Sequence, residues 1–148
     1  MSKVFNTDFE LSLRTLMLLS VCKKAISLDK ILALDFITIY GKNFGINQES
    51  LNGENEFCFS EIAYRRELLK IATKELVLDN LVNISSSDSG FVYSINDRGN
   101  TLCDSLDSEY AHEYMTHVED MLKIFGTMSE KELMQEIGNR ARSNVQRI

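Results

Sequence analysis

Proline is absent from this chain of 148 residues, and glycine occurs only 7 times. The turns of a β-sandwich or a β-barrel depend heavily on these two residues, so an all-β fold of this length would lack turn residues. Without proline, no ring interrupts the hydrogen bonding of a long helix. The sequence therefore predicts a mainly α protein with few turns and long helices.

Apolar residues recur three and four positions apart in several stretches, which is the spacing of one helix face. Each predicted helix begins at a residue type that commonly caps helix N-termini. The expected starts are Asp8, Ser27, Ser60, Asn96 or Asp97, Asp107 or Ser108, and Ser129, the last in a capping box with Glu132. The third helix is expected to run to about Leu81, with Ile71 widening its apolar face.

Two segments depart from helical spacing. Residues 42–59 are rich in asparagine and glycine and predict a long loop. Residues 82–95 alternate apolar and polar side chains around a Ser/Asp/Gly turn, which predicts a β-hairpin. Three helices followed by a hairpin is the order of a winged helix-turn-helix. We therefore expect a winged-helix domain over 8–106, with an inserted loop at 42–59 and a wing hairpin at 82–95. We also expect additional C-terminal helices to form an extension over 107–148. Their apolar faces are not needed to close the core of the winged-helix domain.

The overall charge and the cysteine pattern narrow the class of protein. The formal charge is −6, which argues against nucleic-acid binding by the chain alone. Cys22, Cys58 and Cys103 are odd in number and far apart, which fits reduced thiols. No apolar run reaches the ~18–20 residues of a membrane span, and the N-terminus lacks a secretory signal layout. The expected location is cytoplasmic, with no membrane partner.

Two groups of residues are candidates for binding other macromolecules. Arg65, Arg66, Lys70 and Lys74 lie in the third predicted helix and are the candidate DNA-facing residues. Four acidic residues in the same helix cancel their charge, so a solvated or partner-facing surface is the alternative. The hairpin turn at 85–90 contains no Lys or Arg, which argues against DNA reading by the wing.

The aromatic residues of the 42–59 segment form the second group. Phe44, Phe57 and Phe59 are candidate partner-binding residues, because aromatic side chains often dominate the energy of protein interfaces. The alternative is that these rings anchor the loop to the core.

No motif for catalysis, metal binding or a cofactor emerges. His112 and His117 are five positions apart, whereas the helical zinc motif needs histidines at i and i+4. The chain has no CxxC pair and no GxxxxGK[ST] phosphate loop. We expect a protein that is not an enzyme and that carries no cofactor.

Four sequence blocks resemble a known family. The blocks are residues 12–24, residues 28–45, residues 60–81 with Arg65-Arg66-Glu67-Leu68, and the run Tyr93 to Gly99. They resemble the middle components of bacterial three-component ABC-ATPase systems. The resemblance implies a non-catalytic subunit that bridges an SMC-like ATPase and an effector nuclease in Lamassu-type antiphage or anti-plasmid defence. It also implies that DNA is reached only through the complex. The alternative is a winged-helix transcription regulator that uses the basic residues of the third helix on DNA.

Overall fold

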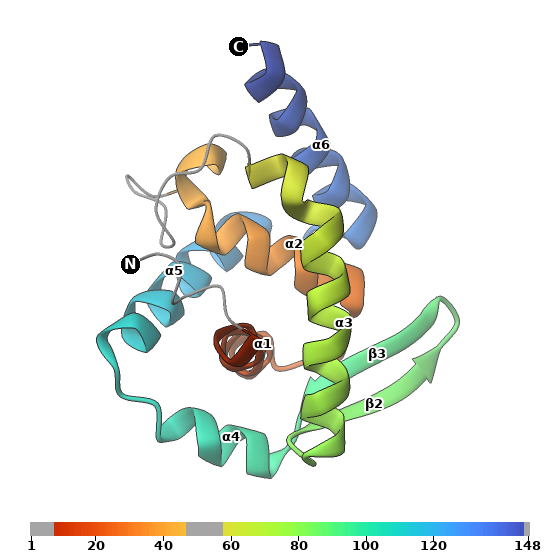
Figure 1. Ribbon diagram of the computed structural model, residues 1–148, viewed down its shortest axis with the longest axis vertical. Helices are drawn as coiled ribbons and strands as arrows, with labels where there is room; N and C mark the ends of the chain where they lie inside the picture. The colour runs from red at the N-terminus through yellow and green to blue at the C-terminus, as the bar shows by residue number, and fades with distance from the viewer. Residues whose placement is uncertain (1–7, 47–57, 147–148) are drawn as a thin grey trace.

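The computed structural model describes residues 8–46 and 58–146, and within them the chain forms six α-helices and a three-stranded antiparallel sheet. The mainly α class with a small sheet is confirmed (Figure 1). In chain order the elements are α1 (Asp8–Cys22), β1 (Ile26–Ser27), α2 (Leu28–Ile39), η2 (Gly41–Phe44), η3 (Cys58–Glu61), α3 (Ile62–Leu78), β2 (Val82–Ser87), β3 (Gly90–Ile95), α4 (Asp97–Asp104), α5 (Glu109–Phe125) and α6 (Glu130–Gln146).

The sheet has the strand order β1-β3-β2. The predicted hairpin of β2 and β3 is confirmed, and it extends away from the helices beside α3 (Figure 1). Its turn is tighter than predicted, because residues 85–87 belong to β2 and Ser87 pairs with Gly90. Strand β1 was not predicted. It has only two residues, and Ile26 pairs with Tyr93, which lies far along the chain. Two residues are too few to show an alternating pattern.

Helices α1 and α2 form the centre of the core. Every residue of α2 from Ile31 to Ile39 is buried, and Leu16, Leu18 and Leu19 are buried in α1. Figure 1 shows α1 end-on near the middle, with other helices around it. A helix that is apolar all round needs cover on every side. In the described part of the chain, no helix is both long and apolar enough to cross a membrane.

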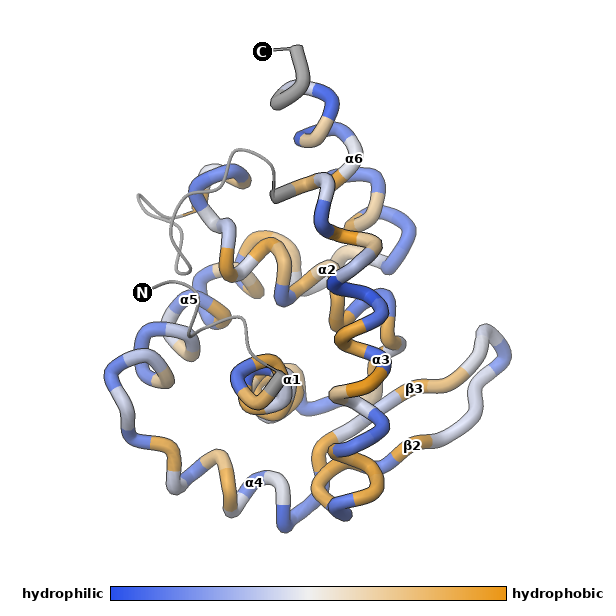
Figure 2. Tube along the Cα trace, in the orientation of Figure 1, coloured by the Kyte–Doolittle hydropathy of each residue, from blue (hydrophilic) through white to orange (hydrophobic). Residues whose placement is uncertain are grey.

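Helices α5 and α6 supply part of that cover, which corrects the expectation of spare apolar faces. Tyr114, Val118 and Met121 of α5, with Leu133 and Ile137 of α6, belong to the same core cluster as α1 and α2. Both helices contact α2. In Figure 2 the hydrophobic segments of these helices alternate with hydrophilic ones, as expected for helices with one buried face.

The ends of α3 differ from the prediction. The expected cap at Ser60 is wrong, because the 3-10 turn η3 precedes α3 and the N-cap residue Glu61 makes no side-chain capping bond. The helix ends at Leu78 instead of Leu81. Asn80 adopts φ 59°, and the Leu81 N–H donates to the carbonyl of Leu76 at 3.0 Å. This pattern is the Schellman helix end, with asparagine in the left-handed position.

Local capping chemistry was predicted well elsewhere. The side chains of Ser27, Asn96 and Ser108 each accept a hydrogen bond from the backbone N–H three residues later. Ser129 and Glu132 form the predicted capping box, with reciprocal bonds of 3.1 and 2.8 Å. The bonds from Ser129 lower the pKa of Glu132. The predicted loop over 42–59 carries η2 and η3 at its two ends, and its residues 47–57 lie outside the described residues.

Candidate functional site

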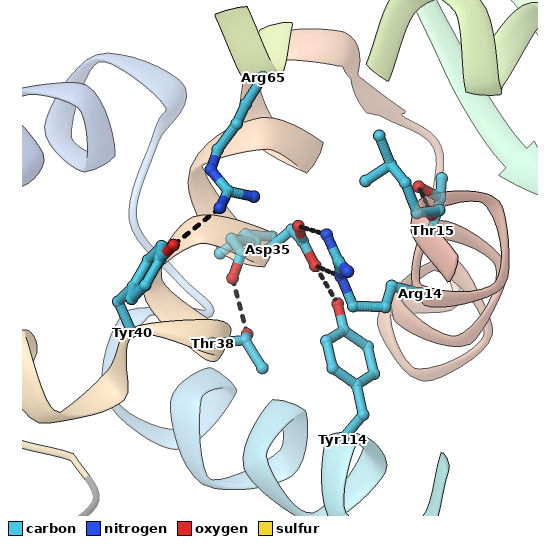
Figure 3. A network of polar contacts seen from close by, with 9 residues as sticks. Arg14, Thr15, Asp35, Thr38, Tyr40, Arg65 and Tyr114 are labelled. Carbon is cyan, nitrogen blue, oxygen red and sulfur yellow. Dashed lines mark hydrogen bonds and ion pairs between the residues drawn. The ribbon is translucent and has the colours of Figure 1, made fainter. Parts of the chain in front are cut away.

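A buried ion pair and a tyrosine hydroxyl join α1, α2 and α5. Arg14 of α1 donates from Nε and Nη2 to the two carboxylate oxygens of Asp35 of α2, at 3.0 and 3.2 Å. The hydroxyl of Tyr114 of α5 donates to Asp35 Oδ1 at 2.6 Å. Figure 3 shows the three side chains converging from their helices. Arg14 is 1% exposed, Asp35 is 7% exposed and Tyr114 is 0% exposed, so the pair is largely shielded from solvent.

Burial sets the electrostatics of this network. Burial lowers the pKa of Arg14, but the charge and hydrogen bonds of Asp35 outweigh it and raise the pKa above its usual value. Burial, followed by the nearby Asp35 charge, raises the pKa of Tyr114 well above 10. Burial also raises the pKa of Tyr110 to about 12. The arginine therefore stays charged and both tyrosines stay neutral near pH 7.

Arg65 of α3 lies beside this network, across a small cavity from Arg14 and Asp35. Its Nη2 donates to the Tyr40 hydroxyl at 2.7 Å, and its guanidinium lies 5.3 Å from the centre of the Tyr40 ring. A cavity of about 20 Å³ lies between Arg65, Arg14 and Asp35, which is room for about one water molecule. The buried Arg65 Nε faces no hydrogen-bond partner within the described residues. A space this small admits no organic substrate, so this arrangement positions helices.

Sequence reasoning missed this network, although a signal was present. Arg14 and Asp35 each lie within an apolar helical stretch whose neighbours are buried. Charged side chains are almost never fully buried unless they are paired. Two opposite charges in two deeply apolar helices therefore indicate a buried pair, whereas the third member, Tyr114, follows only from the packing of α5.

The four candidate DNA-facing residues of α3 differ in exposure and in the groups that they contact. Arg65 is mostly buried against Tyr40. Arg66 pairs with Asp29 at the start of α2, at 2.6 and 3.3 Å, and these hydrogen bonds raise the pKa of Arg66. Lys70 lies 3.6 Å from Glu67, and Lys74 is exposed. Three of the four cations thus contact groups of this chain, and their role at DNA stays a prediction.

Three large apolar side chains of α3 lie on the side of the helix away from the core, and one of them is Ile71, which the sequence assigns to the widened apolar face. Tyr64, Ile71 and Leu78 are 67%, 51% and 73% exposed. We call these three residues the α3 stripe. The sequence alone does not reveal the stripe, because α3 has apolar residues on two sides and only packing shows which side is covered. Large apolar side chains exposed in a row are typical of an interaction surface.

Other exposed apolar side chains lie on separate elements. They are Phe9 on α1, Ile84 and Phe91 on the hairpin, and Ile124 on α5. An open groove of about 760 Å³ lies between the end of α3 and α4, with Asp79, Arg98 and Leu102 among its lining residues. Arg98 donates to the backbone carbonyl of Asp79 across it, at 3.4 Å.

The loop aromatics divide between the core and the undescribed segment. Phe44 is buried, and its ring centre lies 6.1 Å from that of Phe59 and 6.3 Å from those of Phe36 and Phe125. Phe59 is half-buried. Phe57 lies outside the described residues. In this chain Phe44 and Phe59 stabilise the fold, and a partner-binding role for the three residues stays a prediction.

The remaining candidate residues do not converge. Within 8–46 and 58–146, no three His, Cys, Asp or Glu side chains are close enough to hold a metal ion. His112 is exposed and His117 is half-buried. Burial raises the pKa of the Cys22 and Cys103 thiols, so both are weak nucleophiles near pH 7.

Comparison with known proteins identifies the family. No curated protein and no solved structure matches the chain. The family model of the ABC-three component (ABC-3C) system Middle Component 2 matches residues 4–147, which is nearly the whole chain. The match agrees with the resemblance seen in the four sequence blocks. The chain therefore belongs to the ABC-3C Middle Component 2 family and is a middle component of such a three-component defence system.

Proposed function

We propose that this chain is a non-catalytic subunit that bridges an SMC-like ABC ATPase and an effector nuclease in antiphage or anti-plasmid defence of the Lamassu type. Family membership supports a place in a three-component system. The observation that carries the bridging role is the exposure of large apolar side chains on separate elements after the core is complete. The α3 stripe, Phe91 and Ile124 are examples. A bridging subunit needs at least two such surfaces.

The same proposal includes a winged-helix unit. The element order α1-β1-α2-α3-β2-β3 and the strand order β1-β3-β2 support a winged helix over residues 8–106, with the hairpin at 82–95 as its wing. Residues 107–148 are then a helical extension whose α5 and α6 share the core of that unit. In this arrangement α3 and the wing are the elements presented to a partner.

Co-expression of the three components of the system tests the bridging role. We expect the ATPase and the effector to co-purify through size exclusion only when this chain is present. Each should also bind this chain in a separate pairwise experiment. Association of ATPase and effector without this chain, or a middle component that stays a solitary monomer beside both, contradicts the proposal.

The alternative function is a winged-helix DNA-binding regulator that uses Arg65, Arg66, Lys70 and Lys74. The exposure of Lys70 and Lys74 on α3 favours it. Binding of the isolated chain to a labelled DNA duplex, measured by fluorescence anisotropy at two salt concentrations, separates the two functions. The regulator requires affinity that falls steeply with salt and falls again in Lys70→Gln/Lys74→Gln. The bridging proposal predicts no specific binding by the chain alone.

A further inference from the structure

A small cavity lies where α1, α2 and α3 meet. Its volume is about 20 Å³, and three of its lining residues are charged, namely Arg14 of α1, Asp35 of α2 and Arg65 of α3. The other lining residues are apolar: Leu11, Leu32, Phe36, Leu68 and Leu69. A water molecule needs about 10–15 Å³ of such space and two to four polar partners. The cavity therefore has the size and the mixed lining of a water site.

The Arg65 guanidinium provides hydrogen-bond donors beside this cavity. Its Nη2 donates to the Tyr40 hydroxyl at 2.7 Å and lies 3.6 Å from Glu61, while its buried Nε has no hydrogen-bond partner within the described residues. A guanidinium carries five N–H donors, and a buried donor without a partner is costly. Figure 3 shows this side chain reaching from α3 towards Tyr40 and Asp35. Arg65 therefore has N–H groups available for a further acceptor.

The Asp35 carboxylate provides an acceptor on the other side of the cavity. Its Oδ1 accepts two bonds, from Arg14 Nε at 3.0 Å and from the Tyr114 hydroxyl at 2.6 Å. Its Oδ2 accepts one bond among the described residues, from Arg14 Nη2 at 3.2 Å. A carboxylate offers about four lone-pair sites, two on each oxygen. Oδ2 can therefore accept a further hydrogen bond.

The charges around the cavity favour water over other occupants. The two guanidinium groups repel a cation, and the Asp35 carboxylate repels an anion. An empty cavity is disfavoured because cavities that stay dry are lined by apolar groups alone. The volume is too small for an organic ligand. A neutral molecule of one heavy atom that both accepts and donates hydrogen bonds fits these limits.

We propose that this cavity binds one ordered water molecule, which accepts a hydrogen bond from the Arg65 guanidinium and donates one to Asp35 Oδ2. The water joins α3 to the buried ion pair of α1 and α2, and through Asp35 to Tyr114 of α5. A polar bridge as well as apolar packing then holds α3 to the core. The inference does not depend on the bridging function, because every group that it uses lies inside this chain.

A high-resolution crystal structure of the full chain tests the site directly. We expect one peak of solvent density within about 2.7–3.2 Å of both an Arg65 guanidinium nitrogen and Asp35 Oδ2. An empty cavity, or an Arg65 side chain that bonds Asp35 directly and fills the space, overturns the proposal. A second crystal soaked in sodium bromide distinguishes water from an anion. An anomalous bromide peak at this position would assign the cavity to an anion and would also overturn the proposal.

Nuclear Overhauser effects between water and methyl groups test the site in solution. Leu32 and Leu69 are buried and line the cavity, whereas Leu18 is buried and does not line it. We expect cross-peaks to water at the methyl groups of Leu32 and Leu69, with the sign of a long-lived bound water, and none at Leu18. Cross-peaks of equal intensity at all three residues, or none at Leu32 and Leu69, overturn the proposal.

Two variants separate the water bridge from the direct bond of Arg65 to Tyr40. Tyr40→Phe removes that hydroxyl and leaves the cavity lining unchanged, so the cross-peaks of Leu32 and Leu69 should persist. Arg65→Met removes the guanidinium, and the same cross-peaks should be lost. Thermal unfolding shows whether each variant folds, and the unchanged chain decides the site if one does not. Undiminished cross-peaks in folded Arg65→Met overturn the proposed bridge.

Discussion

At the scale of single residues, Arg14, Asp35 and Tyr114 form a buried polar group inside a helical core. Apolar packing alone is compatible with several registers between helices, and we expect the two bonds from Arg14 to Asp35 and the bond from Tyr114 to favour one of them. Such a pair contributes little net stability, because desolvation offsets much of the attraction. Removing only one member of the network is costly, because it leaves another buried polar or charged group without its partner.

We predict that Asp35→Leu lowers the free energy of unfolding by about 3–5 kcal/mol, since it leaves the Arg14 charge buried and unpaired. The triple variant Arg14→Met/Asp35→Leu/Tyr114→Phe removes all three polar groups and should lose much less. Urea unfolding at neutral pH measures both. If the triple variant loses more free energy of unfolding than Asp35→Leu does, the three side chains act independently.

The buried tyrosines predict alkaline sensitivity. In the unfolded chain the pKa of a tyrosine hydroxyl is about 10. In the folded chain burial raises the pKa of Tyr110 to about 12 and raises the pKa of Tyr114 well above its usual value. Since these folded values are raised, their contribution to stability is complete below about pH 10 and is lost as the pH rises above it.

Tyr114→Phe should therefore reduce the loss of stability between about pH 9 and about pH 11, while it lowers stability at neutral pH by about 1.5–3 kcal/mol through the lost bond to Asp35. Urea unfolding across this pH range is the measurement. The exposed Tyr64→Phe is the matched control, and it should change neither quantity. An identical alkaline decline in Tyr114→Phe would contradict this account.

At the scale of helices and strands, local signals predicted the starts of most elements but not the ends of α3. Caps such as Ser27 and Ser108 use a side chain and a backbone N–H three residues apart, so the sequence contains the whole interaction. The end of α3 depends on Asn80 taking a left-handed conformation, which then lets Leu81 turn towards β2. Strand β1 depends on Ile26 meeting β3, and no local pattern encodes that pairing.

The helix end at Asn80 gives a prediction at this scale. Most residues with a Cβ pay about 1–2 kcal/mol in the left-handed region, whereas asparagine and glycine adopt it readily. Asn80→Ala should lower the free energy of unfolding by about 1 kcal/mol, and Asn80→Gly should leave it nearly unchanged. Thermal or urea unfolding of the two variants provides the comparison. Equal stability of Asn80→Ala and Asn80→Gly would show that this conformation carries no cost.

At the scale of the whole molecule, α5 and α6 complete the core rather than stand apart from it. Tyr114, Val118 and Met121 are each 0% exposed and lie in the cluster that α1 and α2 form. Removal of α5 would open that cluster and leave Asp35 without the Tyr114 hydroxyl. The proposed winged-helix unit is therefore a topological unit that depends on the extension for its stability.

A truncation series tests this dependence. A fragment ending at Leu106 should lack a cooperative unfolding transition and bind a hydrophobic dye, because apolar surface of α1 and α2 is exposed. A fragment ending at Thr127 loses only α6, with the buried Leu133 and Ile137, and should unfold cooperatively at a lower temperature than the full chain. A fragment ending at Leu106 that unfolds as cooperatively as the full chain would show that 8–106 is independent.

The sequence by itself determined the helical class, the hairpin at 82–95, the main helix caps and, through four blocks of residues, the family. These features are encoded by neighbours in the chain or by residue order. Only the tertiary structure decided that Arg14 meets Asp35 and Tyr114, that the last two helices are core, and that Tyr64, Ile71 and Leu78 face solvent. Apolar spacing shows that a helix has a face to bury, but the rest of the molecule decides which face is covered. For α3 the covered face packs on α1 and α2, and Tyr64, Ile71 and Leu78 on the opposite side stay exposed.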